Sequence, residues 1–389
     1  MMLRKFFFMT ASVFLSLSLG SCASTNIKNI AEQDTHELYA DEARLYNRVA
    51  EAREKLKKGG FLLKDEVLED YINKVLHKLV GDFEKEHGVT LHAYILPDPY
   101  FNAFCYPDGT IYLHTSILSH LENEAQLATV LAHESVHFMN RHALKAFRSN
   151  INKTSFLKTM SVACSGLSGG IFETIFIKGI EGSIYGYERK LEAEADRIGF
   201  ELVKKAGYDI KQTQKTFEIF YEITKNDKIK TPYFYHKHPS LKWRIREYKK
   251  FIKESREKDG EIAGVMRFDE YNKAVRRVFL VNAELDMKRG KVSLAQKQVE
   301  RYNYFYPDDP KAYCLLGELE AKDGNRHQAA EMFKKAIELD DAYPKSHKCL
   351  GMLHYKKGEK ELAKAAFKKY LTLNPGALDA EYIRGYLNE

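Results

Sequence analysis

An HExxH string is the clearest chemical signal in this sequence. It is formed by His133, Glu134 and His137, inside residues 122–141, whose apolar spacing predicts a long helix. Residues four apart lie on one face of a helix, so both imidazoles can reach one metal ion. Glu134 lies beside them and can take a proton from the metal's water. The string therefore predicts a metal-dependent hydrolase with Glu134 as its general base.

A third metal ligand is expected from a second predicted helix. A catalytic zinc ion takes three protein ligands and leaves one position open. Glu192 and Asp196 are four residues apart and share a helix face. We expect Glu192 to bind a single zinc ion together with His133 and His137, while Asp196 accepts the outer N–H of one histidine. Glu194 lies on another side of this helix and is the alternative ligand.

HExxH followed by ExEAD on a helix resembles the zinc metallopeptidase family that includes the bacterial proteases BepA and HtpX and the eukaryotic CAAX prenyl protease. The resemblance covers roughly residues 41–255. It implies an α+β, HExxH zincin-type domain that is mainly helical with a small β element. Without transmembrane helices, the chain is similar to the soluble, BepA-type branch. That branch implies unfolded or misassembled envelope proteins as substrates and an outer-membrane assembly machine as a partner.

The family also has an HPxxxxR element, which His238 and Arg244 match here. In relatives this histidine can approach the zinc ion, either stabilising the transition state or blocking the open position. The resemblance therefore implies catalytic roles for His238 and Arg244, because a cation near the developing oxyanion lowers the barrier. His236 is the alternative histidine.

Other elements are expected to frame this site. Apolar residues at helical spacing between 41 and 80 predict helices, and residues 89–96 and 110–113 predict strands. An exposed edge of such a sheet could pair with an extended substrate. The apolar, glycine-containing stretch 155–180 is interpreted either as a mobile flap over the cleft or as a buried helical hairpin.

The N-terminus predicts export and lipidation. Arg4 and Lys5 precede a short apolar run, which ends in small residues and Cys22. This pattern is typical of a secretory signal, and its end resembles the bacterial lipobox. We expect a lipoprotein signal peptide at 1–21, a lipid on Cys22 that places the protein on a membrane surface, and a flexible tether over 22–40. The alternative is an ordinary signal peptide. The lipidated cysteine departs from BepA and leaves the substrate set open.

The C-terminal part shows an internal repeat with a period of 34 residues. Small or aromatic residues recur in one register: Gly290, Gly324 and Gly358; Ala295, Ala329 and Ala363; Gly317 and Gly351; Phe333 and Phe367. This period is typical of tetratricopeptide repeats, in which helix pairs stack into an α-solenoid. We expect a peptidase domain over 41–255, a charged junction over 253–261 and a repeat domain over 262–389.

Composition sets broad limits. Charged residues make up 30% of the chain and the formal net charge is +7, without a basic block that would indicate a nucleic-acid partner. Cys105, Cys164, Cys314 and Cys349 fit either four thiols or one Cys314–Cys349 bridge. The HExxH and ExEAD motifs predict a zinc endopeptidase, and the signal and lipobox residues predict an exported, periplasm-facing lipoprotein, with the outer membrane as its expected place. A role in envelope protein quality control is what the resemblance to the BepA-type branch implies. The alternatives are a tetratricopeptide adaptor with a latent peptidase domain and a different metal-dependent hydrolase.

Overall fold

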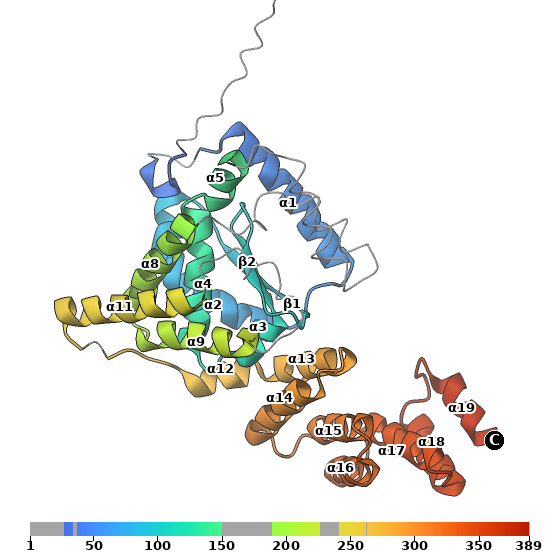
Figure 1. Cartoon of the computed structure of the whole chain (residues 1–389). Coiled ribbons are helices and arrows are strands. Elements are labelled where there is room, and N and C mark those ends of the chain that lie inside the picture. Colours follow the sequence, from blue (N-terminus) through green and yellow to red (C-terminus); the bar gives the residue numbers. More distant parts are fainter. Residues whose placement is uncertain (1–26, 34–36, 150–188, 226–240, 262, 389) are drawn as a thin grey trace, which may run out of the picture.

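The computed structural model describes residues 27–33, 37–149, 189–225, 241–261 and 263–388. These residues form a mainly helical body with a small sheet, followed by stacked helix pairs (Figure 1). The predicted fold class is therefore confirmed. Among the described residues, none of the helices combines the length and apolar character that crossing a membrane requires.

The described residues contain one three-stranded sheet of order β1-β3-β2. Strand β1 (His92–Leu96) runs parallel to β3 (Thr110–His114), and β2 (Ala103–Cys105) runs antiparallel to β3. The turn into β3 depends on Gly109, whose φ of +84° favours glycine. Because β3 lies between the other two strands, β2 is at one edge of the sheet.

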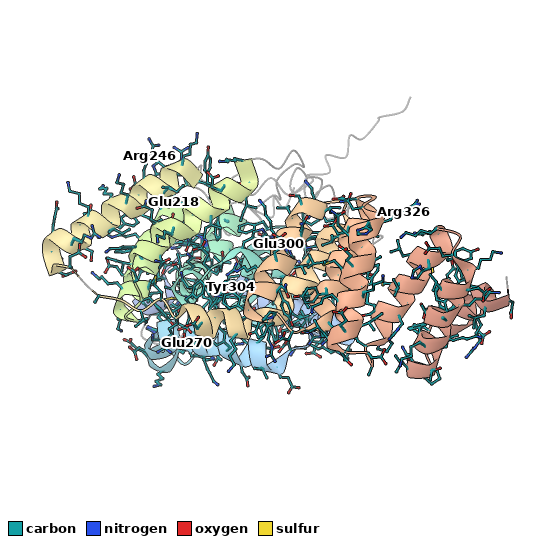
Figure 2. The ribbon with its side chains drawn as sticks, turned by 90° about the horizontal axis from the view of Figure 1, so that it is seen from below. Glu218, Arg246, Glu270, Glu300, Tyr304 and Arg326 are labelled. Carbon is teal, nitrogen blue, oxygen red and sulfur yellow. The ribbon has the colours of Figure 1, made fainter. Side chains whose placement is uncertain are left out.

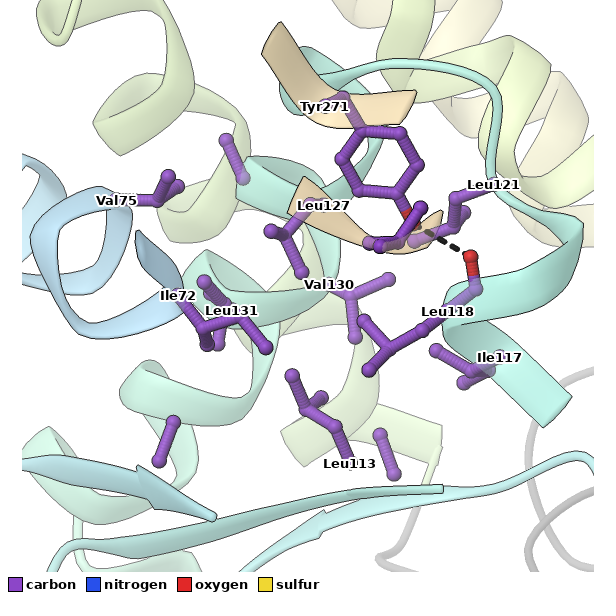
Figure 3. Close-up of a cluster of buried hydrophobic side chains, with 14 of the residues drawn as sticks. Ile72, Val75, Leu113, Ile117, Leu118, Leu121, Leu127, Val130, Leu131 and Tyr271 are labelled. Carbon is purple, nitrogen blue, oxygen red and sulfur yellow. Dashed lines mark hydrogen bonds between the residues drawn. The ribbon is translucent and has the colours of Figure 1, made fainter. Parts of the chain in front are cut away.

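Helix α4 (Glu124–Met139) is the centre of the body, and every residue in it is buried. Asn123 begins the helix by accepting the backbone N–H of Gln126 at 3.1 Å. Helices α2 (Glu66–His87), α8 (Arg189–Lys205) and α9 (Lys211–Lys225) pack against it. Figure 3 shows how Leu127, Val130 and Leu131 of α4 meet side chains of α2, β3 and α3 (Thr115–His120).

The N-terminal segment differs from the expected flexible tether. Short helix η1 (Ile30–Glu32) and α1 (Ala40–Lys58) pack on the body, next to α5 (His142–Ser149) (Figure 1). Ile27 and Ile30 are 5% and 0% exposed. Residues 27–33 thus pack on the folded body, because the two isoleucines bury apolar surface that a tether would leave in water.

The charged stretch expected as a domain junction is also helical. Helix α11 (Leu241–Asp259) continues through it, with ion pairs between side chains four residues apart, such as Lys253–Glu257 at 3.6 Å. The chain then passes residue 265, which bridges to Tyr208, and enters α12 (Phe268–Ala274). The charged stretch up to Asp259 is therefore helix rather than an extended linker, and the domain bounds stay a prediction.

The first repeat is joined to the peptidase body through buried polar contacts. Thr115 of α3 donates to Asn282 of α13 (Arg276–Lys288) at 3.1 Å. Arg301 of α14 (Val292–Phe305) donates to the carbonyl oxygens of Ser119 and Leu121 at 3.0 and 2.8 Å. Tyr271 adds a 2.6 Å hydrogen bond to the Leu118 carbonyl (Figure 3). One continuous hydrophobic core runs from α2 to α15 across this contact.

The remaining helices form the stacked pairs that the 34-residue period predicted. They are α15 (Pro310–Lys322), α16 (Arg326–Leu339), α17 (Pro344–Lys356), α18 (Lys360–Leu373) and a final α19 (Ala380–Asn388). A Cβ added at Gly317 would lie 2.4 Å from the ring of Phe333, and one at Gly351 would lie 2.7 Å from Phe367. Glycine therefore recurs where the aromatic ring of each second helix presses on the first. Figure 2 shows charged side chains such as Arg246 and Arg326 pointing outward.

The described cysteines, Cys105, Cys314 and Cys349, are free thiols. The Sγ atoms of Cys314 and Cys349 lie 3.9 Å apart. Cys164, with the stretch 155–180, lies outside the described residues.

Candidate metal centre

Three donor atoms from two helices converge inside the body. Nε2 of His133 lies 3.1 Å from Nε2 of His137, and the carboxylate oxygens of Glu192 lie 3.5 Å from each of these nitrogens. All three donor atoms lie within 4.8 Å of one another. The three side chains are almost completely shielded from solvent. The structure thus brings together the residues that the sequence singled out as ligands.

The two helices approach closely at a glycine. A Cβ added to Gly199 of α8 would lie 3.2 Å from the backbone nitrogen of His133, which is tighter than ordinary packing. Ala195 is fully buried one turn earlier. These small residues let α8 lie against α4, so that Glu192 reaches the two histidines.

The donor set fits a zinc ion. Donor atoms about 2.1 Å from a tetrahedral zinc ion lie about 3.4 Å apart. The two imidazole nitrogens are 3.1 Å apart, and each lies 3.5 Å from one oxygen of Glu192, Oε2 for His133 and Oε1 for His137, which is close to that value. Two imidazole nitrogens and one carboxylate are also a known catalytic zinc set. Side-chain chemistry and spacing therefore both allow His133, His137 and Glu192 to hold the metal.

Asp196 lies behind His133, on the side away from the donor atoms. Its Oδ1 is 3.0 Å from Nδ1 of His133, as expected for an outer hydrogen bond that leaves Nε2 for a metal. Tyr248 donates to the same oxygen at 3.0 Å. Burial opposes a charge on Asp196, but the Arg244 guanidinium and the His133 hydrogen bond hold the pKa of Asp196 below its usual range.

Arg244, the predicted catalytic arginine, lies against the donor side chains, with its Nη2 3.0 Å from Nδ1 and 3.4 Å from Nε2 of His133. Arg244 is 1% exposed and donates two hydrogen bonds to Asp196, from Nε–H to Oδ2 at 2.8 Å and from Nη2–H to Oδ1. Its Nη1 lies 3.8 Å from Glu192 Oε2, and its guanidinium lies 4.0 Å from the ring centroid of Phe217. These contacts let Arg244 orient Asp196 and place its positive charge next to the metal ligands, and its predicted catalytic role stays a prediction.

His142 contacts the site although the sequence analysis missed it. Its Nδ1 lies 2.9 Å from Nδ1 of His137, and its Nε2 lies 3.6 Å from Oε2 of Glu194. Glu194, the alternative ligand, is thus outside the donor set. His142 comes five residues after His137, a spacing that would not share a helix face, so no periodicity indicated it.

Glu134 is placed to act as a base. It is 2% exposed and accepts the backbone N–H of Cys105 on edge strand β2. Burial raises the pKa of Glu134 to about 7, against the opposing effect of the His133 charge. A carboxyl group with a pKa near neutrality is suited to taking up and releasing a proton.

Hydrogen bonds with the acids also favour a proton on His133. Burial and the Arg244 charge lower the pKa of His133, but hydrogen bonds to Asp196 and Glu192 outweigh them and raise it to about 9. A metal ion bound there would take the place of that proton.

Three predicted site residues, His238, its alternative His236 and the lipidation residue Cys22, lie outside the described residues.

Residues 65–252 match "Peptidase family M48", and residues 310–343 and 350–376 match "Tetratricopeptide repeat". The beta-barrel assembly-enhancing protease of Yersinia pestis is 30% identical over 157 residues, which are 38% of this chain and 32% of that protein. The mitochondrial metalloendopeptidase OMA1 of Schizosaccharomyces pombe is 29% identical over 190 residues, 48% of this chain and 54% of that one. This chain thus spans from about a third to half of the length of these relatives.

Among solved structures, the tetratricopeptide protein YrrB is 15% identical, with a TM-score of 0.26 over 48% of this chain and 89% of that one.

Proposed function

We propose that this chain, which contains a peptidase family M48 domain followed by tetratricopeptide repeats, is an exported zinc endopeptidase of the bacterial cell envelope. The observation that carries the proposal is the convergence of His133, His137 and Glu192 within 4.8 Å, beside the buried carboxyl group of Glu134. A scaffold or storage site has no need of the general base.

The proposed chemistry is hydrolysis of a peptide bond. A bound zinc ion would polarise the scissile carbonyl and acidify a water molecule. Glu134 removes a proton from the attacking water and later delivers it to the leaving amine. Arg244 and Asp196 hold the His133 ring in place. His238 remains proposed as the residue that reaches the open position, either to stabilise the transition state or to block it.

Edge strand β2 is the proposed support for the substrate main chain. It pairs with β3 on one side, and its Cys105 N–H is hydrogen-bonded to Glu134. The three residues of β2 are buried rather than exposed as expected, so an extended peptide would have to displace what covers this edge. It would then run past the base and be recognised largely through its backbone.

The place of action is proposed from the sequence and from the printed names of the relatives. Signal residues 1–21 and a lipid on Cys22 would hold the protein on the outer membrane, facing the periplasm. The relatives named for β-barrel assembly support unfolded or misassembled envelope proteins as substrates. The repeats would contact the assembly machinery.

An adaptor function is the second candidate, because a groove of about 850 Å³ lies along the start of the repeats. It is lined by aromatic, cationic and acidic side chains of α13, α14, α15 and the turn after α14, including Arg276, Tyr306 and Asp308. A groove of this size could hold a segment of a partner chain.

The test compares two substitutions in the full chain. We expect Glu134→Gln to retain one zinc ion and lose casein hydrolysis, and His137→Ala to lose both. Zinc content is measured by elemental analysis, and cleavage is measured after repurification to remove contaminating proteases. If Glu134→Gln cleaves casein at the wild-type rate, the proposed mechanism is wrong. If the wild-type protein binds zinc, shows no cleavage, yet retains envelope proteins, the adaptor function is favoured.

A further inference from the structure

The turn after α4 brings a third histidine, His142, next to the ligand His137. Helix α4 ends at Met139, and Arg141 adopts φ +49°, a left-handed conformation that residues with a side chain rarely take. This turn sends His142 back toward the helix it has just left. His142 is 0% exposed, and its ring meets the His137 ring edge to face, with centroids 5.0 Å apart.

The hydrogen bonds define which ring nitrogen of His137 can face a metal. If Nε2 of His137 is to donate its lone pair, its proton must be on Nδ1. That N–H then donates to Nδ1 of His142 across 2.9 Å. The His142 proton is left on Nε2, which faces Glu194 Oε2 at 3.6 Å. Asn140 donates to the other oxygen of Glu194 at 2.6 Å and holds it there.

An N-terminal strap, residues 27–33 and 37–42, holds this turn from the other side. Arg141 is 3% exposed, and its Nε–H donates to Oε1 of Glu42 at 2.8 Å. Both N–H groups of Nη1 and one of Nη2 donate to the carbonyl oxygens of Lys28 and Glu37 and to the side chain of Gln33. A buried guanidinium with this many partners has one orientation, so the residue next to it is fixed as well.

We propose that His142 is a positioning residue that fixes the ring of His137 for metal binding, and that the strap holds His142 in place through Arg141. The inference rests on the proposed zinc function. The inference goes beyond that function because the strap lies outside the residues matched to the peptidase family, 65–252. Each histidine ligand then has its own support: Asp196 behind His133, and the His142–Glu194 pair behind His137.

The first experiment measures metal binding by the full chain with His142→Leu and His142→Asn. Leucine removes the acceptor, whereas the asparagine Oδ1 can stand where Nδ1 stood. We expect His142→Leu to weaken zinc affinity about 10–100-fold in competition with a chromogenic chelator, and to alter the visible absorption bands of the cobalt-substituted protein. We expect His142→Asn to remain close to wild type in both measurements.

Folding is checked by far-ultraviolet circular dichroism and thermal unfolding of the metal-free variants. Wild-type zinc affinity in a folded His142→Leu protein would overturn the inference. Equal weakening in both variants, with equal stability, would also overturn it, because it would mean that the hydrogen bond is not what matters. Failure of the wild-type protein itself to bind zinc would instead refute the proposed function.

The strap is tested by Glu42→Ala, with Glu51→Ala as the control on an exposed position of the same helix, α1. We expect Glu42→Ala to weaken zinc affinity less than His142→Leu does, and to shift the cobalt spectrum in the same direction. Glu51→Ala should change neither. A Glu42→Ala protein that loses thermal stability but keeps wild-type zinc affinity and cobalt spectrum would overturn the role of the strap.

Discussion

Arg244 donates from Nε to Oδ2 of Asp196 at 2.8 Å, in a region where both side chains are almost fully shielded from solvent. A charge pair of this kind costs desolvation free energy for both partners, and losing one partner leaves the other charged and alone. The pair therefore makes the stability of the peptidase domain depend on a residue that the sequence pattern placed at the catalytic step.

Replacing Arg244 by methionine is expected to lower the free energy of unfolding by about 3 kcal/mol, because the buried Asp196 would keep only its contacts with His133 and Tyr248. Urea unfolding of the metal-free protein measures this change. The matched control is Arg246→Met on the exposed face of α11 (Figure 2), which should stay within about 0.5 kcal/mol of wild type. Equal effects of the two substitutions would show that the Arg244–Asp196 pair does not stabilise the fold.

Gly199→Ala is expected to weaken zinc binding, because its Cβ would lie 3.2 Å from the His133 backbone nitrogen and push α8 away from α4. Stability should fall by about 1 kcal/mol. Gly81 in α2 has open space around it, so Gly81→Ala should instead stabilise by about 0.4–1 kcal/mol. Chelator competition and urea unfolding give both quantities. Unchanged zinc affinity in Gly199→Ala would contradict the close approach as the reason that Glu192 reaches the site.

Gly317→Ala is expected to destabilise the repeats by about 1–3 kcal/mol, because its Cβ would lie 2.4 Å from the Phe333 ring. Adding Phe333→Leu should restore part of the loss by removing the ring that clashes. Gly385→Ala in α19 meets nothing within 4 Å and is the control. The midpoint temperatures of thermal unfolding of the three variants check this expectation. Equal midpoints for Gly317→Ala and Gly385→Ala would contradict it.

Zinc affinity is expected to rise by about tenfold per pH unit between about pH 6.5 and 9, because the metal displaces one proton from His133. Because the pKa of His133 is raised to about 9 without metal, the zinc affinity increases as the pH rises toward that value. Below it the metal competes with the proton, and above it the competition ends. In the metal-free protein the same shift contributes stability below about pH 6.5 that is lost as the pH rises toward 9.

Titration calorimetry in two buffers of different ionisation enthalpy counts the protons released. Asp196→Asn removes a carboxylate that raises this pKa, so the variant should release fewer protons at pH 7.5. An affinity that is flat across this range would contradict protonation of His133 in the metal-free protein.

The sequence predicted those parts of the site that depend on one helix at a time. His133 and His137 share a face because of a fixed spacing, and Glu192 with Asp196 obey the same rule on α8. The repeat register was also readable, because Gly317 and Phe333 recur in the next unit at the same interval. In each case a regular spacing along the chain was enough to show which side chains share a helix face or a repeat position.

The missed features depend on how the chain leaves a helix. His142 reaches His137 only because Arg141 turns the chain, and that turn depends on Glu42, which is distant in sequence. The end of α11 was misread for a related reason: an exposed helix needs few apolar residues when Lys253 and Glu257 pair along it, so its composition looked like a linker. Neither feature leaves a periodic pattern.

The hydrogen bond between Thr115 and Asn282 has a consequence for how the two parts of the chain work together. Since the first helix pair of the solenoid shares its interior with the metal-bearing body, the two cannot swivel independently at that contact. A change in the position of the first helix pair would therefore disturb the packing of α3, which the same core joins to the metal-bearing helix α4.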